Sequence, residues 1–214
     1  MEPSRRRIWN SDLLVVNHAL FFADLALRRE GASVLPDYDV VVFDEAHTLE
    51  QVAADHLGIS VTSGQVEYLL SRLYNDRTQK GLLAKLPFST SDFIEQRVNA
   101  EQLVDRIRFQ SRDLFASLAE WRQSTGTRNG RLRKPPDVPN EVSPSLKELA
   151  AMIMELARPI ERDEARIEFT AAADRCVGLA NSLNSWMQQT NEDCVYWIES
   201  SGPQQQRIRL VSAP

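Results

Sequence analysis

The chain is poor in cysteine and has no long apolar run. Its two cysteines among 214 residues, Cys176 and Cys194, fit no C-x-x-C spacing, so neither a zinc site nor a disulfide framework is supported. No apolar run approaches the ~20 residues that span a bilayer, and the Arg-rich start lacks the apolar core of a signal peptide. We therefore expect a cytoplasmic protein without membrane contact.

A surplus of positive charge is also lacking. The net charge is -5, which excludes a protein that coats nucleic acid by bulk electrostatics, because such binding draws on many surplus lysines and arginines. Any contact with nucleic acid must be local. The composition, 43% hydrophobic and 26% charged, is typical of a folded globular protein. The length allows one domain or one and a half.

Two short apolar runs near the start predict buried strands. They are Asp12–Asn17 (D-L-L-V-V-N) and Val40–Phe43 (V-V-V-F), and each is followed by a helical pattern. Strands that alternate with helices and read as continuous apolar runs indicate a parallel α/β sheet. Ligands bind such sheets beyond the carboxyl ends of the strands, which is where Asp44 and Glu45 stand.

The helical patterns extend through most of the chain. We expect Ser63 to cap one of these helices and Pro159 to kink or divide the last one, because an interior proline removes a hydrogen bond. The two longest should pair as an antiparallel hairpin. The first predicted helix is His18–Arg29, with Gly31 as the stop signal just past its end. The others run from residue 48 or 49 to Leu57, from Ser63 to Leu73, from Asp92 to about Gly126, and from Ser143 or Ser145 to about Trp186.

Two other parts of the chain are predicted to be non-helical. Residues Thr125 to Pro144 hold two glycines and four prolines and are predicted to form an exposed connection. The segments Cys194–Glu199 and Arg207–Val211 are predicted strands, separated by a Ser-Gly-Pro turn. The fold class we expect is an α/β segment with a large, mainly helical insertion.

The Asp44-Glu45-Ala46-His47 box carries the chemistry. An apolar strand that ends in Asp-Glu is the arrangement in which nucleotide hydrolases hold magnesium, because it places the first carboxylate at the water shell of the metal. The second carboxylate can orient the attacking water. A chance match to the four letters has a probability of roughly one in a thousand for a chain of this length.

Around this box the sequence resembles a known family. V-V-V-F-D-E-A-H-T-L-E looks like the Walker B, or DEAH-box, segment of superfamily 2 helicases. L-L-V-V-N-H-A-L-F-F-A-D-L-A-L-R, with L-P-D-Y-D ahead of the box, narrows the resemblance to the iron-sulfur-type XPD/DinG helicases. The ending, V-Y-W-I-E and R-L-V-S-A-P, is similar to the stretch where that family leaves its helical Arch insertion.

The resemblance implies roles for the box residues. Asp44 would bind Mg²⁺ through water, Glu45 would activate the hydrolytic water, and His47 would couple the ATP site to the DNA-binding face. The intact protein would be an ATP-dependent DNA helicase of the DNA-repair type, acting on single-stranded or forked DNA. Residues 1–60 would belong to motor domain 1, 61–192 to the Arch domain, and 193–214 would return toward motor domain 1.

The chain also departs from the family pattern. No glycine is followed by lysine, so the G-x-x-x-x-G-K-[ST] phosphate loop (Walker A) is absent, as are the S-A-T motif and motor domain 2. An iron-sulfur cluster is compatible with the intact protein, but this chain offers no ligands for it. We expect an internal fragment whose partner is the rest of the helicase polypeptide, and which hydrolyses no ATP alone.

Simpler interpretations stand beside these. Asp44 and Glu45 fit solvated carboxylates at a helix start. His18, His47 and His56 could form a metal cluster with those carboxylates, as in a metal hydrolase, but their spacings match no common ligand pattern. Trp121, Trp186 and the Leu/Ile stripes fit a core better than a base-stacking surface. The basic tip could bind a DNA backbone or form a solvated loop; it comprises Arg128, Arg131, Arg133 and Lys134.

A rival function comes from a different class. The chain could be a non-enzymatic helical-hairpin module that binds a partner protein or DNA, with the α/β start as scaffold. The box and the Asn-His segment, which is the stretch around Asn17 and His18, favour the helicase. A Gly-Lys-Ser/Thr loop upstream in the reading frame and a second motor domain downstream would separate the two hypotheses.

Overall fold

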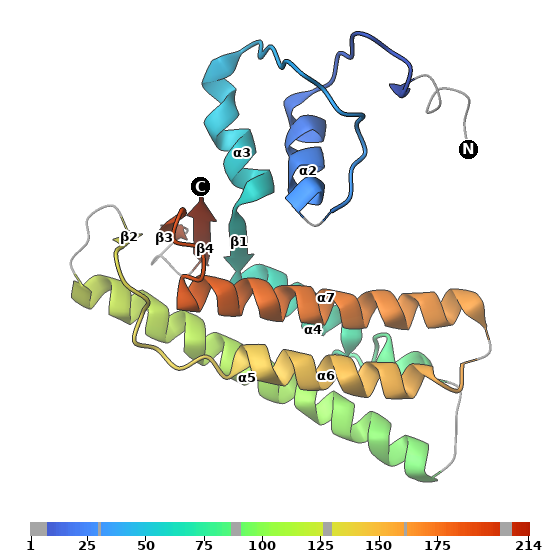
Figure 1. Cartoon of the computed structure of the whole chain (residues 1–214). Coiled ribbons are helices and arrows are strands. Elements are labelled where there is room, and N and C mark those ends of the chain that lie inside the picture. The colour runs from blue at the N-terminus through green and yellow to red at the C-terminus, as the bar shows by residue number, and fades with distance from the viewer. Residues whose placement is uncertain (1–7, 30, 87–90, 126–129, 161, 202–206) are drawn as a thin grey trace. The chain divides into compact units, whose positions relative to one another are not determined.

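The chain forms two compact units in a computed structural model (Figure 1). The structure describes residues 8–29, 31–86, 91–125, 130–160, 162–201 and 207–214. The first unit consists of Met1–Ile59, Asp193–Val195 and Ser212–Pro214, and the second of Ser60–Glu192 and Tyr196–Val211. The secondary structure is mostly helical. No helix among the described residues combines the length and apolarity that crossing a bilayer requires.

Two helices form the frame of the first unit, as the sequence predicts. They are α2 (His18–Arg29) and α3 (Leu49–Leu57), and they pack against each other. Asn17 caps α2, because its side-chain oxygen accepts the backbone N–H of Leu20 at 2.8 Å. Gly31 follows the helix with a φ of 80°, a left-handed conformation that glycine adopts without a steric penalty.

A buried carboxylate joins α2 to the loop that follows it. Asp24 is fully buried, and its Oδ1 accepts the backbone N–H groups of Val34 and Leu35 at 2.6 and 2.8 Å. Its Oδ2 pairs with Nε of Arg28 at 2.6 Å, and Arg28 also donates to Asp37. Burial acts to raise the pKa of Asp24, but the hydrogen bonds it accepts outweigh this effect and hold the pKa below its usual value.

The two apolar runs predicted to be buried strands form no strand in this structure. Asp12–Asn17 and Val40–Phe43 are irregular, and four of their side chains are 78 to 92% exposed: Leu13, Val15, Val40 and Val42. A strand needs a neighbour for its backbone N–H and C=O groups. In the described residues the sheet is built from other segments, so the predicted parallel sheet is absent.

Four helices dominate the second unit. They are α4 (Ser63–Leu73), α5 (Ser91–Thr125), α6 (Val142–Ala157) and α7 (Asp163–Gln188). Helix α6 packs against α5 and α7 and runs antiparallel to both (Figure 1), which confirms the predicted hairpin and adds a third layer. The break around Pro159 divides α6 from α7. The core of this unit includes the fully buried Leu70, Ile107, Leu118, Leu146, Leu149, Ile153, Leu183 and Trp186.

The cap of α4 lies one residue before the predicted Ser63. The Thr62 side chain accepts the backbone N–H of Gln65 at 3.0 Å, and the Gln65 side chain accepts that of Thr62 at 2.8 Å. This capping box stabilises the start of the helix. The segment between α4 and α5 contains a short 3-10 helix, η2 (Leu83–Lys85).

A four-stranded antiparallel sheet completes the second unit, in the order β1-β4-β3-β2. The strands are β1 (Ile59–Thr62), β2 (Arg131–Leu132), β3 (Val195–Ser201) and β4 (Arg207–Ala213). The two predicted C-terminal strands are confirmed as β3 and β4. The predicted turn between them lies largely outside the described residues, at 202–206.

The predicted exposed connection at 125–144 is partly built into this sheet. Leu132 is buried in β2, which pairs with β3. Gly130 makes the approach possible, because its φ is 70° and a Cβ would lie 2.3 Å from the carbonyl oxygen of Ile198. Composition alone indicated a loop, but close backbone contact with β3 determines its path.

Candidate functional site

The Asp44–His47 box stands on an exposed turn between the apolar run at 40–43 and η1 (Ala46–Thr48), a 3-10 helix that leads into α3. All four residues of the box are exposed. Oδ1 of Asp44 accepts the backbone N–H of Glu45 at 2.9 Å. The carboxylates of Asp44 and Glu45, which are consecutive in the chain, are thus both accessible to solvent.

Glu45 adopts a left-handed backbone conformation, with φ 49° and ψ 46°. For a residue other than glycine this costs on the order of 1 kcal/mol, so surrounding contacts must hold it. Thr48 supplies two: its backbone N–H and its Oγ1 hydroxyl both donate to the carbonyl oxygen of Glu45, at 2.9 and 3.0 Å. These two bonds fix the turn that presents the Glu45 carboxylate.

His18 connects this turn to the Asn-His segment. Its Nδ1 lies 3.2 Å from Oγ1 of Thr48. This is within hydrogen-bond distance, and which of the two groups donates depends on the tautomer of the imidazole. His18, the first residue of α2, therefore contacts Thr48, which in turn holds the backbone of Glu45.

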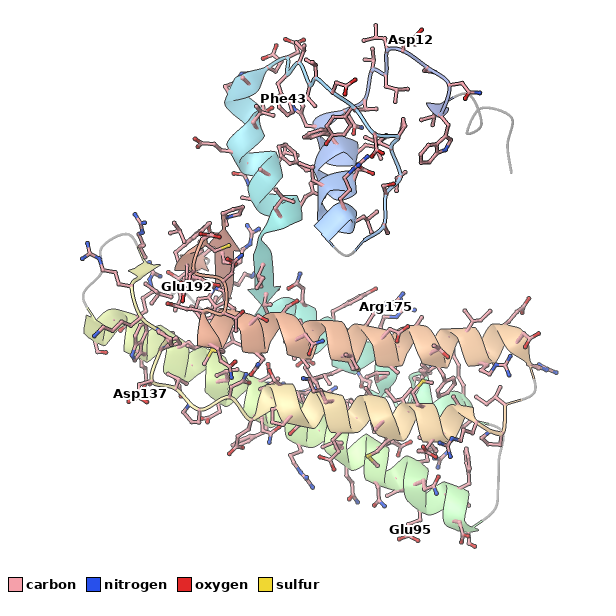
Figure 2. The ribbon with its side chains drawn as sticks, viewed as in Figure 1. Asp12, Phe43, Glu95, Asp137, Arg175 and Glu192 are labelled. Atoms are coloured by element: carbon pink, nitrogen blue, oxygen red, sulfur yellow. The ribbon has the colours of Figure 1, made fainter. Side chains whose placement is uncertain are left out.

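An aromatic cluster fastens the residue before the box to α2. The ring of Phe43 lies 5.1 Å from that of Phe21, at nearly a right angle, and 6.3 Å from that of Phe22, nearly parallel. His18 is 5.9 Å away. Figure 2 shows Phe43 beside α2. Both arrangements are favourable for aromatic pairs, so Phe43 anchors the turn.

The third predicted site residue, His47, contacts the second. Its Nδ1 lies 3.2 Å from Oε2 of Glu45, and the two side chains are 74 and 68% exposed. At this exposure water screens the pair, so its contribution to stability is small. The contact places the His47 ring beside the Glu45 carboxylate.

The donor chemistry of the box suits Mg²⁺. Carboxylate oxygens are hard ligands, and Mg²⁺ commonly takes one or two of them while keeping several waters and binding substrate phosphates. Asp44 and Glu45 supply such oxygens on an open surface. Among the described residues no group of three histidine, cysteine, aspartate or glutamate side chains is placed to hold a metal by itself.

The cysteines offer no second centre. Cys176 is buried in the helical core, and burial raises the pKa of its thiol to about 12, so the thiolate that binds metals does not form near neutral pH. Cys194 is half-buried and is not disulfide-bonded.

The basic tip belongs to the second unit. Arg131 lies in β2 and is exposed, and Arg133 and Lys134 follow it on the surface. Arg128 lies outside the described residues. The structure therefore presents three of the four predicted basic residues to solvent along one short segment.

Sequence reasoning missed the supports of the box. The sequence marks Thr48 only as a possible first residue of a helix, and Asp24 and Arg28 only as positions in the segment that resembles the helicase family. A carboxylate in the apolar part of a helix, with arginine four residues later, was a usable signal, because a buried acid needs such a partner.

Comparison with known proteins places the chain near helicases. No family model matches it. It is 45% identical over 64 residues to the ATP-dependent DNA helicase YoaA of Haemophilus influenzae and 39% identical over 64 residues to YoaA of Escherichia coli, which is 29% of this chain and 10% of each helicase. The 3'-5' exonuclease DinG of Bacillus subtilis is 28% identical over 120 residues, 55% of this chain and 12% of that protein.

These similarities support a relationship to DinG-like helicases. The aligned part of the chain spans about a tenth of the length of these relatives. The comparison therefore supports a protein related to DNA helicases. It agrees with the resemblance drawn from the box and the Asn-His segment.

Proposed function

We propose that this chain is a segment of a DinG-like, ATP-dependent DNA helicase that couples Mg-ATP hydrolysis to movement on single-stranded DNA. Residues 1–60 belong to motor domain 1, 61–192 form the Arch, and 193–214 return to the motor. The observation that carries the proposal is the exposed Asp44–Glu45 turn, held through Thr48 by His18, in a chain whose relatives are named DNA helicases.

In this proposal the box residues divide the work. Asp44 would hold Mg²⁺ through its bound water, and the metal would supply positive charge to the transferred phosphoryl group. Glu45 orients the attacking water. His47 contacts Glu45 at 3.2 Å, so displacement of His47 when DNA binds frees the Glu45 carboxylate for that water. The phosphate loop comes from the rest of the polypeptide.

The bare apolar face of the first unit supports a motor domain completed by other segments. In the runs at 12–17 and 40–43 exposure alternates: Val42 is 90% exposed and Phe43 38%, as expected for strands with one face on helices. The outward residues Leu13, Val15 and Val40 are equally bare. Further strands and helices of the helicase would pair with and cover these runs.

The isolated chain tests the division of labour. We expect it to show no Mg²⁺-dependent ATP turnover, because positioning the phosphates requires donors it does not carry. A phosphate-release assay on the pure 214-residue chain, with and without single-stranded DNA, is the measurement. Turnover by this chain alone would contradict the proposal.

The whole polypeptide encoded by the surrounding reading frame tests the box itself. We expect DNA-stimulated ATPase activity, and we expect Glu45→Gln to lower kcat about 100-fold or more, since an oriented general base contributes about that much. ATP binding should persist. Glu50→Gln, an exposed glutamate of α3, is the matched control and should leave kcat unchanged. Equal activity of both variants and wild type would show that Glu45 is not the general base, and absence of ATPase activity from the whole polypeptide would favour the non-enzymatic module.

A further inference from the structure

A groove of about 610 Å³ lies between α4 and α7. Its floor is apolar, formed by Val61, Leu69, Leu73, Leu82, Ala172 and Leu179. All its lining residues belong to the second unit. A groove of this size has room for a planar ring and its neighbouring groups.

An exposed aromatic ring stands on one wall of the groove. Tyr68 of α4 is 64% exposed, although large aromatic side chains are usually covered. Nη1 of Arg72 donates to its hydroxyl at 3.2 Å, and the guanidinium lies 5.9 Å from the ring centroid. These contacts hold the ring in position without burying it, as a stacking surface requires.

Positive charge prevails in this groove. Its lining carries Arg72 and Arg175 against a single acid, Glu168, and Glu168 is itself paired with Lys85 at 3.5 Å. Arg175 is exposed and forms no ion pair or hydrogen bond within the described residues. Figure 2 shows it projecting from α7 away from α6. In a chain of net charge -5, this is a local site for an anion.

A second groove, at the junction of α4 and α5, provides the contrast. Its central arginine, Arg108, is held by Glu67 at 3.1 Å and by Asp105. It also carries an exposed aromatic, Phe109. Its charges are balanced, because three acids face three arginines, whereas the groove between α4 and α7 places two guanidinium groups and one acid beside an exposed aromatic ring.

We propose that the groove between α4 and α7 binds single-stranded DNA, with one base stacked on Tyr68 and the adjacent phosphates on Arg72 and Arg175. This inference rests on the proposed function, which supplies the class of ligand. Stacking on an aromatic ring with guanidinium contacts to phosphates is how proteins hold single strands without reading their sequence. The groove is a contact separate from the basic tip.

The test uses the 214-residue chain and a fluorescein-labelled 20-mer of thymidine, followed by fluorescence anisotropy at several salt concentrations. We expect Tyr68→Ala to weaken binding about tenfold, since one stacked base contributes about that much. The double variant Arg72→Gln with Arg175→Gln should reduce the salt slope of log Kd by about 1.4, because each phosphate contact on a single strand contributes about 0.7.

Matched controls lie on α5. Phe109→Ala removes an aromatic that is 73% exposed, against 64% for Tyr68, and Arg106→Gln removes an exposed arginine that is not among the lining residues of either groove. Both variants should bind as the wild type does. Circular dichroism melts confirm that each variant is folded. The proposal is overturned if the wild type does not bind the oligonucleotide. It is also overturned if binding is lost only in the control variants Phe109→Ala and Arg106→Gln. Equal displacement by polyglutamate overturns the single-strand assignment.

This experiment contains no ATP and no motor activity, so its outcome is separate from that of the ATPase test. Suppose that Glu45→Gln abolishes the ATPase activity of the whole polypeptide but the 214-residue chain does not bind the oligonucleotide. The helicase proposal would then stand, and the proposal that this groove binds DNA would be wrong.

Discussion

At the scale of single residues, buried charge is concentrated at Asp24. The carboxylate accepts two backbone N–H groups and pairs with Arg28, which also reaches the carbonyl oxygens of Leu35 and Pro36. One ion pair thereby closes the loop between α2 and the apolar run before the box. Its energetic weight is greater than that of a surface pair, because the acid is fully buried.

Asp24→Asn should lower the free energy of unfolding of the first unit by about 2 kcal/mol, because it leaves the Arg28 guanidinium without its buried counter-ion. The matched control is Asp37→Asn, which removes the fully exposed partner of the same arginine and should cost less than about 0.5 kcal/mol. Hydrogen exchange of α2 amides in urea measures both. Equal effects would show that burial does not decide the strength of this pair.

The same carboxylate predicts a pH dependence. The pKa of Asp24 is lower in the folded chain than its usual value, so its stabilising contribution is complete above the unfolded pKa of about 3.9. It is lost as the pH falls through the folded pKa. The first unit should therefore lose stability below about pH 4, and Asp24→Asn should flatten that decline. An unchanged acid profile in the variant would contradict this assignment.

At the scale of elements, the capped and patterned helices were predictable and the edge of the sheet was not. Helices α2 and α3 form within a residue of their predicted limits because local signals define them: Asn17 and Gly31 for α2, and Gly58 after α3. Strand β2 carries no such signal. Two residues of a Pro-rich connection become a strand only because Gly130 lets them approach β3.

Two glycines give a matched test of this element. Gly130→Ala should destabilise the second unit by about 2 kcal/mol, since it adds a Cβ at a φ of 70° against the carbonyl of Ile198. Gly178→Ala, in α7 with nothing within 4 Å, should instead stabilise the chain by about 0.5 to 1 kcal/mol. Thermal and urea unfolding separate the two. If Gly178→Ala also destabilised the chain, the space beside Gly178 in α7 would have to be occupied by another part of the protein.

At the scale of the whole molecule, the two units differ in how well they cover their apolar residues. The second encloses a helical core that includes Trp186, whose Nε1 donates to the carbonyl of Val211 at 2.9 Å. The first leaves Val15 and Val42 about nine-tenths exposed. Unpaired apolar segments of this kind invite association with other chains.

The double variant Val15→Lys with Val42→Lys should therefore reduce aggregation of the 214-residue chain without loss of helix, because both side chains already lie in solvent. Light scattering at 37 °C and circular dichroism measure the two properties. Phe43→Lys is the contrasting variant and should disrupt the turn, since its ring packs on Phe21. Scattering as rapid as in the wild type would show that these residues do not drive association.

The sequence by itself determined the helices, the two C-terminal strands, the break at Pro159 and the box. Each depends on local chemistry: caps, periodicity, a missing N–H and a four-residue motif. Tertiary structure alone decided that the runs at 12–17 and 40–43 form no strands here, because a strand exists only with a paired neighbour. It also decided that Thr48 and His18 support Glu45 and that Tyr68 shares a groove with Arg175, since such contacts join residues far apart in the chain.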